Sequence, residues 1–249
     1  MAGGFATRLE PIGEFIPKAL LTLNGKPLID YIINDLEGIE AVDRILISTN
    51  KKFEDQFDYW MKLRTAAGFK KKMTLIVEPA IHNGQKLGAV KGIAHAIKEA
   101  RMKDDALIIF GDNFYTFDMG MLMEDLSVSD KIQRPGLIAY DIGSLENAKR
   151  FGVVKEAGGR VTDIEEKPQN PASSLVSTGI YFFPKTAIGH FAKYVRSGGN
   201  TDGMGFFLKW LTTQMEVQAV VPTKGEWFDI GTLDGYKEVF YKQKGYKQK

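Results

Sequence analysis

Two glycines and two cations lie together near the start of the chain, in the segment GGFATRLEPIGEFIPK (residues 3–18). Gly3 and Gly4 allow the backbone to turn tightly and to approach a ligand closely, and their N–H groups can cradle a phosphate. Arg8 and Lys18 add positive charge at the two ends of the same loop. The segment therefore favours a phosphate-binding role, and the simpler alternative is a turn that carries two solvated cations.

Two common phosphate-binding motifs do not fit. A Walker A loop needs Gly-Lys followed by Ser or Thr, whereas the Gly-Lys at residues 25–26 is followed by Pro27. A dinucleotide-binding fingerprint runs directly into a helix. Two prolines and a glycine argue against a regular helix between residues 9 and 18. We therefore expect a long, proline-stiffened loop there.

Two aspartates could hold a metal ion. Asp112 lies two residues after the apolar run ALIIF (residues 106–110), and Asp229 lies in the sequence WFDIGT. Ligands of α/β proteins bind beyond the carboxyl ends of parallel strands, although Asp112 alone could simply cap a turn. Mg²⁺ takes one or two carboxylates and completes its shell with phosphate oxygens and water. Cysteine is absent and the histidine spacing suggests no zinc site, so Mg²⁺ is the expected cofactor.

The elements that must position these groups alternate along the first half. Near-continuous apolar strands separated by helices predict an α/β fold with a Rossmann-like, mostly parallel central sheet and helices on both faces. After residue 135, strands follow one another closely, and Gly158-Gly159 is typical of a hairpin turn, so we expect a smaller, partly antiparallel lobe. The expected helices are 27–36, 53–63, 87–100, 186–194, 204–212 and one from about 233, and the expected strands are 44–48, 73–77, 106–110, 136–140, 152–155, 160–165, 177–183 and 217–221.

Composition narrows the class of protein. The 249 residues suit one large domain, and a formal charge of +2 is too small to favour nucleic-acid binding. Lysines cluster at the C-terminal end, where a solvated tail is the simpler interpretation. No apolar run approaches the ~20 residues of a membrane span, and no signal peptide precedes the fold. We therefore expect a cytoplasmic protein that binds no membrane.

The chain begins directly in a glycine turn, where a βαβ unit would first supply a strand. We therefore expect roughly four to six further residues upstream in the natural protein, about the length of a short strand.

Several short motifs occur in one order along nearly the whole chain. After GFATR (4–8) and Pro-Lys (17–18) come GDN (111–113), RFGVV (150–154), EEKP (165–168), TGIY (178–181) and DIGT (229–232). This series resembles the sugar-1-phosphate nucleotidyltransferase family, the NDP-sugar pyrophosphorylases that include glucose-1-phosphate thymidylyltransferases. Ala6 stands where the family's G-x-G-T-R signature has its second glycine.

The resemblance implies transfer of a nucleotidyl group from a nucleoside triphosphate to a hexose 1-phosphate, with Mg²⁺ and release of pyrophosphate. It implies one nucleotidyltransferase domain (1–249), with a nucleotide-binding half (1–134), a sugar-binding half carrying the second aspartate (135–232), and a C-terminal helix with a basic tail (233–249). Relatives are commonly multimers, so a homo-oligomer is possible.

Carried over residue by residue, the resemblance implies four groups of site residues. The catalytic residues are Arg8, Lys18 and Asp112, and the metal ligands are Asp112 and Asp229. The nucleotide contacts are Ala2, Gly3, Gly4, Thr7, Arg8, Lys18, Glu78, Gly88 and Asp112. The sugar-phosphate contacts are Asn113, Gly152, Glu166, Lys167, Ser177 and Gly179.

The base and the exact reaction stay open. Glu78 stands where the family often has Gln, and an ionised carboxylate can only accept hydrogen bonds. We favour dTTP or UTP as the triphosphate and glucose 1-phosphate as the sugar. A metal-dependent glycosyltransferase is the nearest alternative, although it has no use for the cationic loop. A catalytically silent protein that binds a sugar nucleotide and regulates a partner is another.

Overall fold

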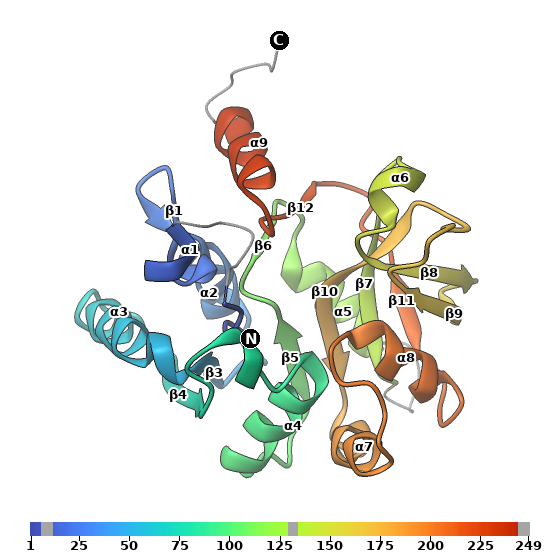
Figure 1. Ribbon diagram of the computed structural model, residues 1–249, viewed down its shortest axis with the longest axis horizontal. Coiled ribbons are helices and arrows are strands. Elements are labelled where there is room, and N and C mark those ends of the chain that lie inside the picture. Colours follow the sequence, from blue (N-terminus) through green and yellow to red (C-terminus); the bar gives the residue numbers. More distant parts are fainter. Residues whose placement is uncertain (6–11, 129–133, 244–249) are drawn as a thin grey trace. The chain divides into compact units, whose positions relative to one another are not determined.

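The computed structural model describes residues 1–5, 12–128 and 134–243 (Figure 1). The chain forms two compact units, each built from separate stretches of sequence. The first comprises Met1–Lys86, Phe110–Thr116 and Glu226–Lys249, and the second comprises Leu87–Ile109 and Phe117–Gly225.

A parallel strand pair forms part of the first unit. β3 (Arg44–Asn50) and β4 (Lys72–Glu78) pair along seven residues, which places Asn50 opposite Glu78. The crossover contains helix α3 (Glu54–Ala66), whose apolar side is anchored by the buried side chains of Phe57 and Trp60. The Trp60 indole N–H donates to a carboxylate oxygen of the buried Asp30 at 2.8 Å. This bond satisfies a polar pair within the core and ties α3 to helix α2 (Leu28–Gly38).

A second strand pair in this unit joins segments that are far apart in the sequence. β6 (Asn113–Tyr115) and β12 (Trp227–Asp229) are antiparallel, with Asn113 opposite Asp229. Phe114 and Ile230 are buried there with Leu23, Leu28 and Val239. The unit's other elements are α1 (Ile12–Phe15), η2 (Lys18–Leu20), β1 (Thr22–Leu23), β2 (Lys26–Pro27), η3 (Lys51–Phe53), η4 (Asn83–Gln85) and α9 (Leu233–Gln243).

The second unit contains a six-stranded sheet among the described residues, in the order β5-β10-β7-β11-β9-β8. Its pairs are antiparallel except β11 with β7. The pairing of β10 with β7 shifts between Ser177 and Tyr181, where Gly179 adopts a φ of +83°. The strands are β5 (Ala106–Ile109), β7 (Gly136–Asp141), β8 (Gly152–Ala157), β9 (Arg160–Glu166), β10 (Leu175–Phe183) and β11 (Gln218–Val220).

Helices complete the second unit (Figure 1). α4 contacts α7, and α8 packs along β9. The rings of Phe191 and Phe207 stack with centroids 4.4 Å apart, and both side chains are fully buried. The helices are α4 (Ala89–Glu99), α5 (Met119–Val128), α6 (Leu145–Ala148), α7 (Lys185–Arg196) and α8 (Met204–Thr212). In the part of the chain that the structure describes, no helix has the length and apolar character to span a bilayer.

The predicted fold class, an α/β protein with parallel pairing and an antiparallel region, is confirmed. Two details were wrong. The strand predicted at 106–110 pairs antiparallel with β10, because its apolar side chains suit either direction of pairing. One helical turn, α1 (Ile12–Phe15), forms where no regular helix was expected, since four residues fit between the two prolines of that loop.

Candidate active site

The first residues of the chain lie beside the end of β3 and the GDN motif. The Ala2 N–H donates to the Ser48 carbonyl at 2.7 Å, and the Gly111 N–H donates to the Met1 carbonyl at 2.8 Å. A Cβ atom added at Gly111 would lie 3.1 Å from that of Ala19, so the backbones approach closely there. The glycine turn and the GDN motif therefore meet, although about 110 residues separate them in the sequence.

Glu78, the residue expected to contact the base, also lies beside the glycine turn. Glu78 is buried, and its carboxylate oxygen would lie 3.4 Å from a Cβ atom placed on Gly3. The Asn50 side chain donates to the Gly3 carbonyl at 3.0 Å, which fixes the turn against β3. Gly4 is exposed, with open space where a Cβ atom would be. Thr7 and Arg8, expected to contact the nucleotide, lie outside the described residues.

Lys18 and Asp112 are brought together. The Lys18 ammonium lies 3.5 Å from a carboxylate oxygen of Asp112, and the side chains are 18% and 32% exposed. Lys18 begins the short η2 turn, directly after the extended Pro17. Both groups therefore remain reachable from solvent, while their partial burial strengthens their mutual attraction.

Asp229 reaches the same region through backbone pairing. The Ile230 N–H donates to the Asp112 carbonyl at 2.9 Å, and Asp229 lies opposite Asn113 in the β6–β12 pair. A Cβ atom at Gly231 would lie only 2.5 Å from the Asp229 carboxylate, so a side chain there would displace that carboxylate from its present position. Asp112 directly precedes β6 and Asp229 ends β12, and two carboxylates fit the donor set of Mg²⁺, which accepts one or two from the protein.

Asn113, which the resemblance implies as a sugar-phosphate contact, has a buried and hydrogen-bonded side chain. Its side chain is 3% exposed, its amide N–H donates to the Phe110 carbonyl at 2.8 Å, and its oxygen accepts from the Trp227 indole N–H. Both ends of the amide are therefore used inside the protein. In this structure Asn113 joins β6 to β12, because a buried amide must satisfy its own hydrogen bonds.

Three predicted sugar contacts lie around one point of the second unit. A Cβ atom at Gly152 would lie 3.6 Å from a carboxylate oxygen of Glu166 and 3.7 Å from the Cβ atom of Ser177. Gly152 is opposite Glu166 in the β8–β9 pair, which explains their proximity. The Ser177 hydroxyl is hydrogen-bonded to the Tyr181 hydroxyl at 3.0 Å. Gly179 lies two residues beyond Ser177, at the irregularity of β10.

Lys167 follows Glu166 directly and has an unusual backbone. Its φ is +48°, and its N–H donates to the Phe151 carbonyl at 2.9 Å. Its ammonium lies 3.5 Å from the Glu166 carboxylate, and its side chain is 55% exposed. A left-handed conformation is costly for a residue with a side chain and is enriched at functional sites. The strained backbone therefore directs a cation beside the carboxylate.

Gly88 precedes helix α4 with a φ of +81°. An added Cβ atom would lie 2.6 Å from the Thr201 carbonyl oxygen, so only glycine fits. Sequence reasoning missed the residues that pack on these contacts, namely Thr201 against Gly88, and Gly203 and Gly205 against Glu166. The glycine-rich run SGGNTDGMG (197–205) before an apolar helix is the signal that could have identified them.

The fold and these clusters define an α/β protein with carboxylates and ammonium groups suited to phosphorylated ligands. The chain belongs to the nucleotidyl transferase family, whose sequence model matches residues 1–245.

Two curated relatives carry descriptions of enzymes that act on sugar 1-phosphates. The chain is 30% identical over 242 residues to a Sulfolobus acidocaldarius protein described as a candidate mannose-1-phosphate guanyltransferase, covering 96% of this chain and 60% of the relative. It is 28% identical over 239 residues to a bifunctional sugar-1-phosphate nucleotidylyltransferase/acetyltransferase of Sulfurisphaera tokodaii, covering 93% and 51%. This chain therefore spans between about half and two thirds of the length of these two relatives.

Among solved structures, a UDP-glucose pyrophosphorylase in complex with UDP-glucose superposes with a TM-score of 0.79 at 20% identity. The match covers 98% of this chain and 96% of that one. At this identity the likeness concerns the fold.

Proposed function

We propose that the protein is an enzyme that transfers a nucleotidyl group from a nucleoside triphosphate to a hexose 1-phosphate, forming a nucleotide sugar and pyrophosphate. The favoured substrates are dTTP or UTP and glucose 1-phosphate. Membership of the nucleotidyl transferase family supports the reaction class. The observation that carries the proposal is the Lys18–Asp112 pair, with Asp229 in the adjoining strand, because it combines a phosphate-binding cation with carboxylates suited to a metal.

The reaction we propose is a direct in-line displacement. An oxygen of the sugar phosphate attacks the α-phosphorus of the triphosphate and forms the new P–O bond. The bond between the α-phosphorus and its bridging oxygen to the β-phosphate breaks, and that oxygen leaves with pyrophosphate. The nucleophile is already an anion, so no general base is required. Positioning and neutralisation of charge then account for catalysis.

The first unit supplies the charges at the reacting phosphates. Lys18 neutralises charge at the phosphates, and Arg8 is assigned to the leaving pyrophosphate. Asp112 and Asp229 would hold Mg²⁺, which neutralises the negative charge that develops during phosphoryl transfer. Since Lys18 contacts Asp112, the ammonium also fixes the position of that carboxylate.

The second unit supplies the sugar contacts. Glu166 accepts hydrogen bonds from sugar hydroxyls, and the absence of a side chain at Gly152 leaves room beside it. Ser177 lies at the edge of the same space, and Lys167 pairs with the sugar phosphate as a point charge. A hexose with one hydroxyl misplaced would leave a polar group unpaired, which is the physical basis of sugar selection.

Base recognition is assigned to Glu78, to the glycine turn beside it and to Gly88. Glu78 can accept a hydrogen bond from the ring N–H of uracil or thymine. The named relatives differ in base, because one is described as a guanyltransferase and another, of Neisseria meningitidis, as a glucose-1-phosphate thymidylyltransferase. We propose that the protein acts in the cytoplasm, where nucleoside triphosphates are available.

The proposal is tested by incubating the full chain and Mg²⁺ with each common nucleoside triphosphate and a panel of hexose 1-phosphates, while measuring pyrophosphate. We expect release only when both substrates are present, most rapidly with dTTP or UTP and glucose 1-phosphate. A glycosyltransferase would instead consume a finished nucleotide sugar and would release no pyrophosphate. Absence of pyrophosphate with every substrate pair contradicts the proposal.

A further inference from the structure

Glu166 is held by the start of helix α8. The Gly205 N–H donates to a carboxylate oxygen of Glu166 at 2.8 Å, and the Glu166 side chain is only 11% exposed. The first N–H groups of a helix lack partners within it, and its N-terminus attracts negative charge. The Glu166 carboxylate therefore caps α8, and the bond fixes the carboxylate in turn.

Two glycines make this contact possible. A Cβ atom at Gly203 would lie 2.5 Å from the Glu166 carboxyl carbon, and one at Gly205 would lie 2.5 Å from its carboxylate oxygen. A side chain at either position would force the Glu166 side chain out of its present position. Both glycines are buried, so Glu166 lies directly against the backbone of the helix start.

The other end of the same short segment holds Gly88. The Thr201 carbonyl accepts from the Val90 N–H at 3.0 Å, which satisfies one of the free N–H groups at the start of α4. The Thr201 hydroxyl donates to the Leu87 carbonyl at 3.2 Å. Residues on both sides of Gly88 are therefore bound to Thr201, and Gly88 itself packs on the Thr201 carbonyl.

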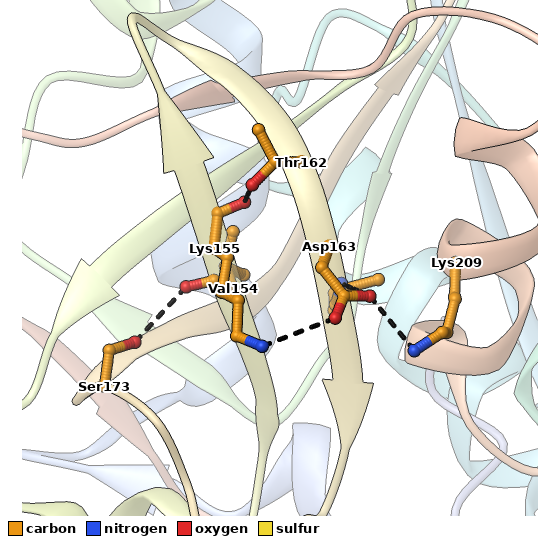
Figure 2. Close-up of polar contacts among 7 residues, drawn as sticks. Val154, Lys155, Thr162, Asp163, Ser173 and Lys209 are labelled. Carbon is orange, nitrogen blue, oxygen red and sulfur yellow. Dashed lines mark hydrogen bonds and ion pairs between the residues drawn. The ribbon is translucent and has the colours of Figure 1, made fainter.

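The segment 201–205, which we call the linking segment, runs into helix α8, and this helix makes further contacts with the β8–β9 hairpin. Figure 2 shows Lys209 of α8 paired with Asp163 of β9 at 3.0 Å, and Lys155 of β8 on the same carboxylate at 3.5 Å. These ion pairs hold α8 to the hairpin that ends in Glu166. The side chains are partly exposed, so these ion pairs add modestly to the contact that Gly205 makes with Glu166.

We infer that the linking segment positions the sugar-binding Glu166 and the base-binding Gly88 relative to each other, so that the two substrates influence each other's binding through it. This inference rests on the proposed function, which assigns the two contacts to sugar and base. Gly203, Gly205 and Thr201 act as positioning residues through Glu166 and Gly88. The contacts to Val90 and Leu87 and the contact to Glu166 are made by residues only four positions apart, so a ligand that restrains one end of the segment also acts on the other.

The first test replaces Gly205 by Ala, with Gly189→Ala as the control. Gly189 lies in helix α7 with open space where its Cβ atom would be. The kcat/KM for glucose 1-phosphate is divided by that for each monodeoxyglucose 1-phosphate, which removes any effect of misfolded enzyme. We expect Gly205→Ala to lower at least one ratio about 10- to 100-fold, as when one hydrogen bond to a charged group is lost. Unchanged ratios in Gly205→Ala overturn the inference.

The second test uses Thr201→Val, which keeps the side-chain shape and removes the hydroxyl. Thr213→Val is the matched control, because the Thr213 hydroxyl donates to the Trp210 carbonyl at the opposite end of α8. Binding of a non-hydrolysable α,β-methylene triphosphate is measured by calorimetry with and without glucose 1-phosphate. In wild type and Thr213→Val we expect the sugar phosphate to change the triphosphate Kd, and in Thr201→Val we expect this factor to move towards one.

The outcomes separate the inference from the proposed function. A wild-type protein that releases no pyrophosphate with any substrate pair overturns both. An active wild type whose triphosphate Kd is indifferent to sugar phosphate, or whose coupling is unaltered by Thr201→Val, overturns the inference alone.

Discussion

The ammonium of Lys18 lies 3.5 Å from the carboxylate of Asp112, although the two residues are far apart in the sequence. Lys18 follows the glycine turn by 14 residues, whereas Asp112 lies three residues beyond the end of the apolar strand β5. In the absence of substrate each neutralises the other. A triphosphate with its cation would redistribute these charges, because the phosphate attracts the ammonium and the cation attracts the carboxylate.

Replacing either member of this pair should lower activity without unfolding the protein. We expect Asp112→Asn and Lys18→Ala each to reduce kcat/KM by about 10²- to 10⁴-fold, the scale of losing a charge-stabilising group at a reacting centre. The double variant should lose less than the product of the two, because each single change already breaks the contact. Pyrophosphate release gives the rates. Lys62→Ala, which removes a surface lysine paired with Asp58, is the control and should retain full activity.

Sequence reasoning located this pair because both residues follow local rules. A proline-stiffened cationic loop and an aspartate after an apolar strand are visible within short windows of sequence. The same holds for the hairpin around Gly158-Gly159 and for helix 204–212, whose bounds agree with α8. Hydrophobic periodicity and turn residues determine such elements without distant contacts.

The features that were missed depend on distant partners. Asn113 looked available beyond the strand, but its partner Trp227 lies 114 residues away in the sequence. Gly203 and Gly205 do not have a positive φ, so their backbone conformation does not call for glycine. The Glu166 side chain, distant in the sequence, occupies the space where their Cβ atoms would lie.

Helix α5 (Met119–Val128) was not predicted. It begins with the run MGMLM, which lacks a clear amphipathic period.

Asn113→Ala tests whether this residue supports the structure. The change leaves the Trp227 indole N–H without its acceptor in a buried position, which costs about 1–3 kcal/mol of unfolding free energy. We expect a lower midpoint in urea and a sugar-phosphate KM close to that of wild type. Trp227→Phe, which removes the donor as well, should be less destabilising in the Asn113→Ala background than alone. A large rise in KM with unchanged stability would instead restore Asn113 as a substrate contact.

Lys167→Gly separates backbone strain from charge. Glycine adopts a φ of +48° without the penalty that a side chain incurs, which stabilises the folded state. Glycine also makes the unfolded chain more flexible, which destabilises the folded state. Because the two effects oppose each other, we expect the thermal midpoint of unfolding to stay within about 3 °C of wild type. The ammonium beside Glu166 is lost, and the KM for sugar 1-phosphate should rise about 10- to 100-fold. Lys167→Met should show the same KM with no relief of strain. Equal KM values for wild type and Lys167→Gly would remove Lys167 from the site.

Glu78→Gln should change the choice of base. An amide can donate to a carbonyl oxygen of the ring as well as accept from its N–H, whereas the carboxylate only accepts. We expect kcat/KM for dTTP and UTP to rise relative to the other triphosphates, while the ranking of hexose 1-phosphates stays the same. Competition between pairs of triphosphates, with products separated by chromatography, measures these ratios. An altered sugar ranking together with an unaltered base ranking would place Glu78 outside the base site.

The Asp163 carboxylate should give the second unit a pH-dependent contribution to stability. The hydrogen bond from Lys209 lowers the pKa of Asp163, further bonds from the Ile164 N–H and Lys155 act in the same direction, and partial burial opposes them. Because the folded-state pKa is depressed, the stabilisation is present above the unfolded pKa of about 4 and is lost as pH falls through the folded value. We expect Asp163→Asn to cost about 0.2–1 kcal/mol at pH 7, the range for exposed ion pairs, and progressively less below pH 4. Unfolding in urea at several pH values gives the difference. Asp58→Asn is the comparison, because its bond to Lys62 joins residues one turn apart in helix α3 and does not connect two elements. A difference between wild type and Asp163→Asn that grows on acidification would contradict the assigned ion pair.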